Sequence, residues 1–263
     1  MDMLHCDWNL SFKRGSGGGP GHREEVIGSN KGDERRGEAV KRNVDLNEIS
    51  DGKLYTADDM VRADCHDCQG CSACCSGMGD SVILDPMDVW RLHRGTGMEF
   101  AELVEKGYVE LGIADGMILP HLAMSDEKET CRFLDEDGRC SIHDVRPGIC
   151  RLFPLGRYYG DEGFRYFLQI HECRKKNRSK IKVKKWIGIP DIKKYERYIS
   201  DWHGFLRQCE EGLKELDKQN ARILRIYVLR IFFQNSFEGE EEEFYIEFRK
   251  RMDETKEKLQ LGR

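Results

Sequence analysis

Residues 65–76 read CHDCQGCSACCS, with five cysteines in the spacing C-x2-C-x2-C-x2-C-C. A two-residue gap lets two thiolates turn toward one ion while the backbone amides between them point at the sulfurs, which is why this gap recurs in zinc and iron–sulfur sites. Cys74 and Cys75 are adjacent, so their side chains diverge and one of them can serve a different ion or lie behind the ligands. The stretch therefore predicts a segment whose fold is organised by a bound metal.

The composition of the chain suits a soluble protein with a core of its own. The 263 residues are 39% hydrophobic, and 43 basic against 48 acidic residues give a net charge of −5, which does not indicate a nucleic-acid binder. No stretch approaches the roughly 18 apolar residues of a membrane span, and the start of the sequence lacks the apolar region of a signal peptide. We therefore expect a cytoplasmic protein whose eleven cysteines are metal ligands or catalytic thiols rather than disulfides.

The sequence divides into three parts. Residues 13–50 combine glycine clusters with mixed charge and almost no large apolar side chains, so we expect residues 1–50 to be a disordered N-terminal segment. Nine of the eleven cysteines fall within residues 51–180, the expected metal-binding domain. Residues 181–263 carry helical patterns and are expected to form a helical C-terminal region.

Within residues 51–180 the sequence predicts short helices and β-hairpins, and hence an α+β fold. Asp85 is followed by proline, which provides an N-cap and a proline at the first helical position, and a second helix is expected within residues 98–107. Residues 131–143 and residues 157–170 each place two short apolar pieces around a turn, DEDG or GDEG. This pattern of two apolar pieces around a turn predicts a β-hairpin in each range.

The last third of the chain shows the period of a long amphipathic helix. Apolar residues follow one another at alternating separations of three and four positions: Ile192, Tyr195, Ile199, Trp202, Leu206, Cys209, Leu213 and Leu216. A second helical run covers residues 222–233, and a third starts near Glu240. The sequence leaves open whether these helices pack on the cysteine domain or against another subunit.

Four further cysteines lie downstream of the first stretch, each beside a turn or a helix start: Cys131, Cys140, Cys150 and Cys173. Together with four cysteines of the first stretch they give eight thiols. These four are Cys68, Cys71, Cys74 and Cys75. Eight thiols can complete two four-sulfur sites, or one cluster with thiols in reserve. An arginine adjoins each downstream cysteine: Arg132, Arg139, Arg151 and Arg174. We interpret these arginines as offsetting the negative charge of a thiolate-rich site, with ordinary surface arginines as the alternative.

The segments CQGCSACCS at 68–76 and CRFLDEDGRCSIHDVRPGICRLFPL at 131–155 resemble, in order and spacing, the motifs of the YkgJ-type cysteine-cluster family, described as a zinc- or iron-chelating domain. The resemblance covers roughly residues 65–175. It implies the following site residues: Cys68, Cys71, Cys74, Cys75, Cys131, Cys140 and Cys150. Cys173 fits a later and looser position of the pattern.

Two positions depart from the family's pattern. Cys65 is an additional thiol that continues the C-x2-C spacing upstream, so we keep it among the candidate metal ligands as an open case. His143 stands where the family more often shows tyrosine, and a solvated or backbone-bonded histidine is favoured over a ligand. Cys6 and Cys209 are not assigned to a site, since Cys209 lies on the apolar seam of a helix, where a thiol behaves as a small hydrophobic group.

The residues and the resemblance together favour a metal-binding protein that holds an iron–sulfur cluster or Zn²⁺ through four or more thiolates. Close runs of thiols are more typical of clusters than of a zinc ribbon's separated pairs, which favours iron and sulfide. Some relatives are flagellin lysine N-methylases, so the alternative is a metal-dependent methyltransferase that uses S-adenosylmethionine. Whether the chain is an enzyme stays open. A thiol redox protein fits less well, because its usual setting is a lone C-x-x-C in a βαβ unit.

The expected partner is another protein. The basic run at residues 174–185 lacks the interleaved aromatic side chains that stack on bases, so a solvated linker is favoured over a nucleic-acid contact. Neither a membrane nor a nucleic acid is expected as a partner, and the oligomeric state is left open.

Overall fold

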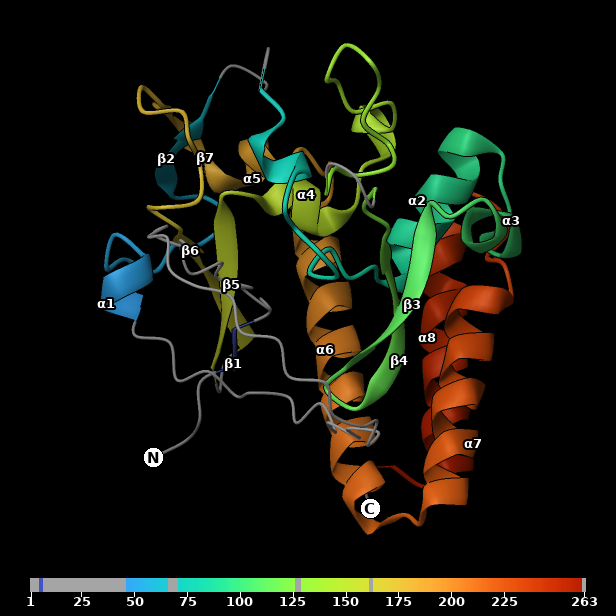
Figure 1. Cartoon of the computed structure of the whole chain (residues 1–263). Helices are drawn as coiled ribbons and strands as arrows, with labels where there is room; N and C mark the ends of the chain where they lie inside the picture. Colours follow the sequence, from blue (N-terminus) through green and yellow to red (C-terminus); the bar gives the residue numbers. More distant parts are fainter. Residues whose placement is uncertain (1–4, 7–45, 66–70, 126–128, 161–162, 262–263) are drawn as a thin grey trace, which may run out of the picture.

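The computed structural model describes residues 5–6, 46–65, 71–125, 129–160 and 163–261 (Figure 1). The expectation of disorder in residues 1–50 falls mostly outside these ranges, as does Cys68. In chain order the elements are β1 (His5–Cys6), α1 (Leu46–Ile49), β2 (Met60–Asp64), η1 (Ala73–Cys75), α2 (Pro86–Thr96), α3 (Phe100–Glu105), β3 (Val109–Ala114), β4 (Met117–Leu122), η2 (His143–Val145), α4 (Gly148–Leu152), β5 (Leu155–Gly160), β6 (Gly163–Leu168), β7 (Ser179–Lys182), α5 (Val183–Ile187), α6 (Ile192–Glu215), α7 (Lys218–Leu229), η3 (Arg230–Gln234) and α8 (Glu241–Leu259).

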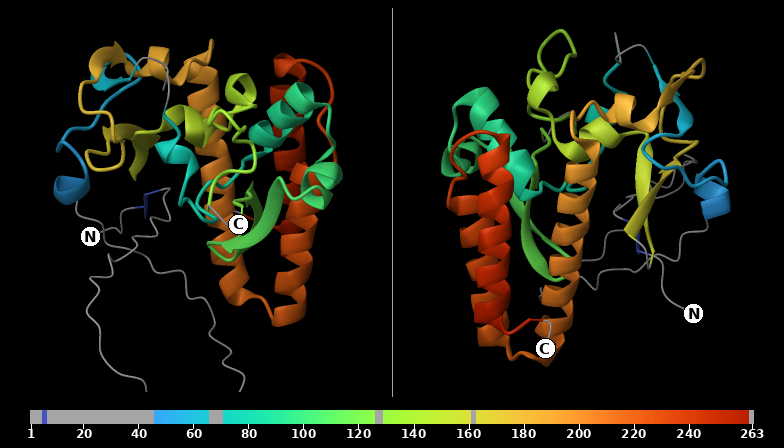
Figure 2. Two further views of the ribbon diagram at one scale, coloured as in Figure 1. Left: turned by 45° about the horizontal axis from the view of Figure 1, so that its top comes forward. Right: turned by 180° about the vertical axis from the view of Figure 1, so that it is seen from behind.

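The chain has the α+β fold that the sequence predicts. The described strands form small antiparallel sheets in the orders β1-β5-β6, β2-β7 and β3-β4. The long helices α6, α7 and α8 run side by side, and the hairpin β3-β4 lies across them (Figures 1 and 2). The short helices α4 and α5 and the thiol-bearing turns gather at one end of this arrangement, above the N-terminal end of α6 (Figure 1).

Both helices predicted in the first half of the chain are present. Helix α2 begins with a capping box, in which Asp85 accepts the amide of Asp88 (2.9 Å) and Asp88 accepts the amide of Asp85 (3.1 Å). The helix ends at Gly97, whose φ of 71° is the left-handed conformation that glycine adopts without strain. The second predicted helix is α3.

The helical C-terminal region is also confirmed. Helix α6 buries the predicted seam from Ile192 to Cys209, and the exposure of Leu216, at 38%, marks where the seam ends. The second run forms α7 and continues into the π-helical turn η3. Helix α8 begins at the acidic run, where Glu240 and Glu243 form a capping box.

Of the two predicted hairpins, the one within residues 157–170 is confirmed as β5-β6. A third hairpin, β3-β4, was not predicted. It turns at Asp115 and Gly116, both with positive φ (47° and 76°), as a two-residue hairpin turn requires. The Asp-Gly dipeptide between two apolar runs is the sequence signal for this hairpin.

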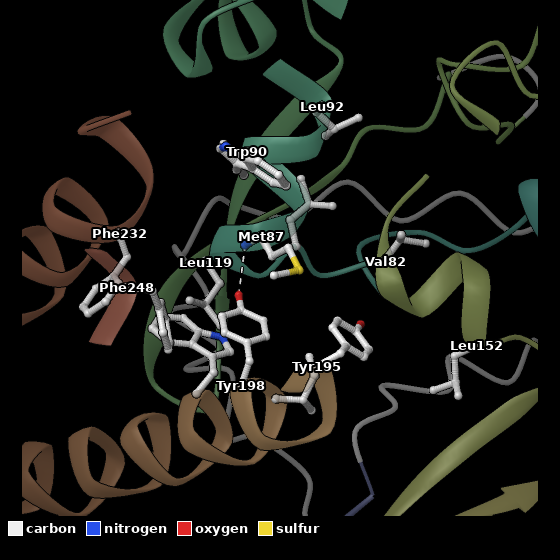
Figure 3. Close-up of a cluster of buried hydrophobic side chains, with 14 of the residues drawn as sticks. Val82, Met87, Trp90, Leu92, Leu119, Leu152, Tyr195, Tyr198, Phe232 and Phe248 are labelled. Carbon is white, nitrogen blue, oxygen red and sulfur yellow. Dashed lines mark hydrogen bonds between the residues drawn. The ribbon is translucent and has the colours of Figure 1, made fainter. Parts of the chain in front are cut away.

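One contiguous cluster of buried side chains extends from the cysteine-rich half into the C-terminal helices (Figure 3). Tyr198 of α6 lies at its centre: its hydroxyl accepts the amide of Met87 (2.9 Å) and donates to Asp85 (2.9 Å). The helices therefore pack on the cysteine-rich part of the same chain, while the domain boundary at residue 180 stays a prediction. None of the helices in the described ranges has the length and apolarity to span a lipid bilayer.

Candidate metal centre

The first thiol-bearing segment is η1, a single turn of 3-10 helix. The amide of Cys75 donates to the carbonyl of Ser72 (2.9 Å), which closes the turn and leaves the side chains of Cys74 and Cys75 half-buried. Gly77 follows at a φ of 70°, and its amide donates to the carbonyl of Glu129 (2.7 Å). The turn is thereby connected to the segment that carries the next thiol.

Main-chain pairing joins η1 to Cys131. Ser76 forms an isolated bridge with Thr130. The amide of Cys131 donates to the carbonyl of Cys75 (2.7 Å), and Cys131 also forms a bridge with Met124. Cys75 and Cys131 are therefore held next to each other by backbone hydrogen bonds that involve no side chain and no ion.

The predicted hairpin at residues 131–143 is wrong: this range forms successive turns with one internal bridge, at Cys140. Asp135 is the reason. Its carboxylate accepts the amide of Arg139 (2.7 Å), and its own amide donates to the carbonyl of Arg139 (2.8 Å). The second bond belongs to the Leu134–Cys140 bridge, but the first one takes the Arg139 amide, which a longer ladder would pair with the carbonyl of Asp135. The turns carry Cys140 back toward the start of the segment.

Cys150 lies on α4, whose first turn is bound by a carboxylate from α2. The amide of Gly148 donates to Asp88 Oδ1 (2.7 Å), and both groups are buried. A Cβ at Gly148 would overlap the hydroxyl of Tyr195, a residue of α6 that points toward α4 and α2 (Figure 3). The indole of Trp186 donates to a carbonyl just after α4 (3.1 Å). Helices α2, α5 and α6 thus fix the position of Cys150, and the capping-box pattern in DPMD was the sequence signal for Asp88.

Six thiols from these segments line one cavity of about 110 Å³: Cys71, Cys74, Cys75, Cys131, Cys140 and Cys150. The rest of its wall is mainly apolar and includes the thioethers of Met78 and Met124 and the rings of Phe153 and Trp186. Carboxylates from the described part of the chain do not line it. The cavity therefore offers sulfur as its main donor, and thiolates prefer zinc, copper(I) and iron–sulfur groups over magnesium or calcium.

Cys74 and Cys75 form a coupled pair. The thiol of Cys75 donates a hydrogen bond to the sulfur of Cys74, which lowers the pKa of Cys74 from 9.0 to about 7, and the charge of Arg146 acts in the same direction. The same hydrogen bond, together with burial, raises the pKa of Cys75. Cys74 is therefore the thiol of this pair that first becomes a thiolate near neutral pH.

Burial raises the pKa of the other three thiols of this group, Cys131, Cys140 and Cys150. The charges of neighbouring cysteines add to the effect, as expected for thiols that line one cavity. Ionising these thiols costs free energy because they are buried and because neighbouring thiolates repel one another. A cation between them lowers both costs, since it replaces the lost solvation and offsets the repulsion. Metal binding here therefore releases protons.

Arg146 is the cation that sequence reasoning missed. It lines the cavity, its charge acts on Cys74 and Cys140, and its Nη1 donates to the carbonyl of His143 (3.0 Å) and lies 2.6 Å from Nε2 of that ring. The R-P-x-x-C-R motif contained it. His143 also lines the cavity, next to Arg146, and its role as a ligand stays untested.

The four arginines predicted to lie near the thiols differ in position. Arg139 lines the large cavity, and Arg174 lines a second cavity described below. Arg132 is exposed. Arg151 donates instead to the main-chain carbonyls of residues 144 and 146. Adjacency in sequence thus placed two of the four guanidinium groups at a cavity wall.

A second cavity, of about 20 Å³, is lined by Cys65, Cys71, Cys74 and Cys173. The antiparallel pair β2-β7 brings Cys65 and Cys173 to this cavity, because Cys65 follows β2 directly and Cys173 precedes β7. Burial raises the pKa of Cys173, and the charges of Cys65 and Cys71 add to this effect. Cys65 and Cys173 therefore lie in one thiol group that also includes Cys71.

The remaining cysteines divide as follows. Cys68 lies outside the described residues, and Cys209 is fully buried on α6, as a core thiol is expected to be. The nine cysteines whose side chains are described are thiols rather than disulfides. In the described ranges, no group of three or more His, Cys, Asp or Glu side chains has the geometry to hold a metal ion as it stands. Ligation of a single ion therefore requires the thiols to draw together.

Comparison with known proteins agrees with the resemblance. Residues 67–182 match the model of the CxxCxxCC family, described as a "putative zinc- or iron-chelating domain". No solved structure matches the chain. The match includes every thiol that lines the large cavity and extends to the end of β7, but it does not reach α6, α7 or α8. Residues 67–182 of this chain are thus similar to the zinc- or iron-chelating domain that this family model describes.

Proposed function

We propose that the chain holds an iron–sulfur cluster in the large cavity, through four of five thiolates: Cys74, Cys75, Cys131, Cys140 and Cys150. The observation that carries this proposal is the volume of the cavity that these thiols line together with apolar side chains and arginines. Four thiolates on one zinc ion lie at about 2.3 Å from it and so within about 4 Å of one another, which leaves no room between them. A cavity of about 110 Å³ is several times the roughly 10–15 Å³ that one water-sized body needs.

The chemistry of the wall supports the same assignment. Cysteine thiolates are the usual ligands of iron–sulfur clusters, and low solvent access and nearby positive charge tune the clusters they hold. The rings of Phe153 and Trp186 cover part of the cavity, and Arg139 and Arg146 provide positive charge at its wall. The residues present therefore fit a negatively charged, sulfur-ligated group.

The test is metal and sulfide analysis of the whole chain purified without oxygen. We expect iron, labile sulfide and broad absorption near ~400 nm, as thiolate-held clusters show. Single serine replacements of the five thiols should remove iron from four variants and leave it in the one whose thiol is in reserve. Cys209→Ala is the matched control, because this thiol is buried far along α6, and it should keep its iron. A colourless chain with stoichiometric zinc would eliminate the cluster.

The methyltransferase that the resemblance suggests ranks second. The thiol-lined cavity, at about 110 Å³, is smaller than the roughly 300–1,000 Å³ typical of sites for small organic molecules. S-adenosylmethionine would therefore need space beyond this cavity. Incubation of the metal-replete chain with labelled S-adenosylmethionine and candidate protein substrates tests this activity, and a lack of label transfer counts against it.

A cytoplasmic location and a protein partner belong to the same proposal. Nine thiols that are not paired as disulfides suit a reducing compartment. A cluster under a cover of apolar side chains and arginines suits exchange of electrons or metal with another protein more than with a membrane. Co-purification from a tagged host under anaerobic conditions would identify such a partner.

A further inference from the structure

The thiols that line the two cavities fall into two groups, which meet at the segment 71–74. Cys71 and Cys74 line both cavities, and Cys65 and Cys173 line only the small one. The charges of Cys65 and Cys71 act on Cys173, whereas the charge of Cys74 acts on the thiols of the large cavity. Of the four cysteines that line the small cavity, three therefore act on one another, Cys65, Cys71 and Cys173, and Cys71 also lines the large cavity.

The two strands β2 and β7 place this second set. They pair antiparallel, and at the end of the pair the hydroxyl of Ser179 donates to the carboxylate of Asp64 (2.7 Å). Cys65 follows Asp64 directly and is buried, with 6% exposed. Cys173 lies in the loop before β7, half-buried. Residues more than 100 positions apart in the sequence are thus brought to one small cavity by main-chain pairing.

The size of this cavity separates it from the first. At about 20 Å³ it has room for one water-sized body, which needs roughly 10–15 Å³. A cluster of several irons and sulfides does not fit such a volume, and a single ion does. Arg174 and Lys175 line the same cavity, so they offset the net negative charge that three thiolates leave on one divalent ion.

We propose that Cys65, Cys71 and Cys173 form a second metal site that holds one zinc ion, separate from the cluster in the large cavity. Three thiolates and one open position, filled by water, complete the tetrahedral coordination that zinc prefers. The three cysteines lie in loops next to β2, η1 and β7, so the sulfurs can close on one ion without movement of a helix core. The site uses Cys65, the thiol that departs from the family's pattern.

This proposal rests on the proposed function in one respect: it assumes that an iron–sulfur cluster occupies the large cavity. The experiment counts both metals in the whole chain, by elemental analysis and native mass spectrometry, and records the visible spectrum. For the wild-type chain we expect iron, sulfide and one equivalent of zinc. The double variant Cys65→Ser, Cys173→Ser should lose the zinc and keep the iron and the absorption near ~400 nm. Conversely, each of the four single serine variants of the large cavity that lose iron should keep the zinc.

Each other result has a defined meaning. Loss of iron and zinc together in the double variant overturns the proposal, because all the thiols then serve one site. A wild-type chain that takes up no zinc after zinc supplementation also overturns it. A chain without iron that still loses one zinc in the double variant supports the second site, while the cluster proposal fails. Circular dichroism of each variant, with Cys209→Ala as the matched control, shows whether the fold is intact.

Discussion

The charge of Arg146 acts on thiols from two different segments, Cys74 and Cys140. Its guanidinium supports the thiolate form of both cysteines. We expect Arg146→Gln to weaken metal retention by roughly tenfold, the lower end of what loss of a residue behind the ligands costs. The measurement is the rate of iron release to a chelator.

Arg132→Gln is the matched control for this prediction, because Arg132 adjoins Cys131 in sequence but is exposed and does not line the cavity. Its release rate should equal that of the wild type. Equal rates in both variants would contradict a role for Arg146 in holding the charge of the thiolates.

The raised pKa of Asp88 makes the free energy of unfolding depend on pH. Burial raises its pKa from 3.8 to about 7, with the charge of Asp85 as the second cause. Between these two values the folded chain keeps a proton that the unfolded chain has released. The contribution of Asp88 to the free energy of unfolding is therefore fully present below about pH 4 and is lost as pH rises to about 7.

Urea unfolding at several pH values tests this dependence. The difference in unfolding free energy between the wild type and Asp88→Asn should change across the window from about pH 4 to about pH 7 and stay constant above it. A difference that does not vary with pH would show that Asp88 titrates at its ordinary value.

At the scale of elements, the contact of α4 with α6 depends on the space between Gly148 and Tyr195. A Cβ at position 148 would collide with the Tyr195 hydroxyl, but it would lie 3.4 Å from the ring carbon that carries this hydroxyl, an ordinary contact. We expect Gly148→Ala to destabilise the chain by about 1–3 kcal/mol, as overpacking does. Tyr195→Phe should restore much of this loss in the double variant.

Thermal or urea unfolding of the two single variants and the double variant completes a double-mutant cycle. Tyr195→Phe alone removes one long hydrogen bond, from Arg157 (3.3 Å), and should cost about 1 kcal/mol or less. Additive losses in the double variant would mean that the two side chains do not compete for one space.

The elements that could be predicted are those whose sequence pattern lies within a few neighbouring residues. The Asp85 cap and the period of α6 depend on residues within a few positions, and both were found. The pair β2-β7 joins residues 115 apart, as Asp64 and Ser179 show, and nothing in either strand alone indicates its partner. The hairpin at residues 131–143 failed because the Asp135 side chain competes for main-chain groups, which an apolar pattern does not reveal.

The candidate site shows the same limit. The spacing of the cysteines, with the family resemblance, singled out the thiols that the structure gathers at the cavities. It could not divide them into two groups, because the division depends on which strand pairs beside Cys65 and which helix carries Cys150. Asp88 and Arg146 belong to the surroundings of the thiols and come into reach only through the packing of α2 and α4.

At the scale of the whole molecule, the buried core is shared by the cysteine-rich segment and the C-terminal helices. Met87, Tyr198 and Phe248 all belong to one buried cluster (Figure 3). A chain that ends after Gly188 would expose the apolar faces of α2 and β4 to water. Each Å² of apolar surface exposed in this way costs about 25 cal/mol of folding free energy. We therefore expect this truncated chain to aggregate and to hold no metal.

Expression of two truncated chains tests this, one ending after Gly188 and one after Leu261. The longer chain retains the whole described core and should be monodisperse in gel filtration, with the metal content of the full chain. A well-folded, metal-replete product from the shorter chain would show that the predicted domain boundary near residue 180 separates independent folding units.

The backbone hydrogen bond from Cys131 to Cys75 (2.7 Å) has a consequence for the lifetime of the protein. Main-chain pairing and the contacts of α4 with α2 and α6 already hold the backbone of the thiol-bearing segments in place. A metal therefore has only to draw the sulfurs together and is not needed to arrange these segments. Oxygen damage to a cluster would then empty the cavity without unfolding the chain. The same molecule could be repaired by new iron and sulfide, rather than degraded and synthesised again.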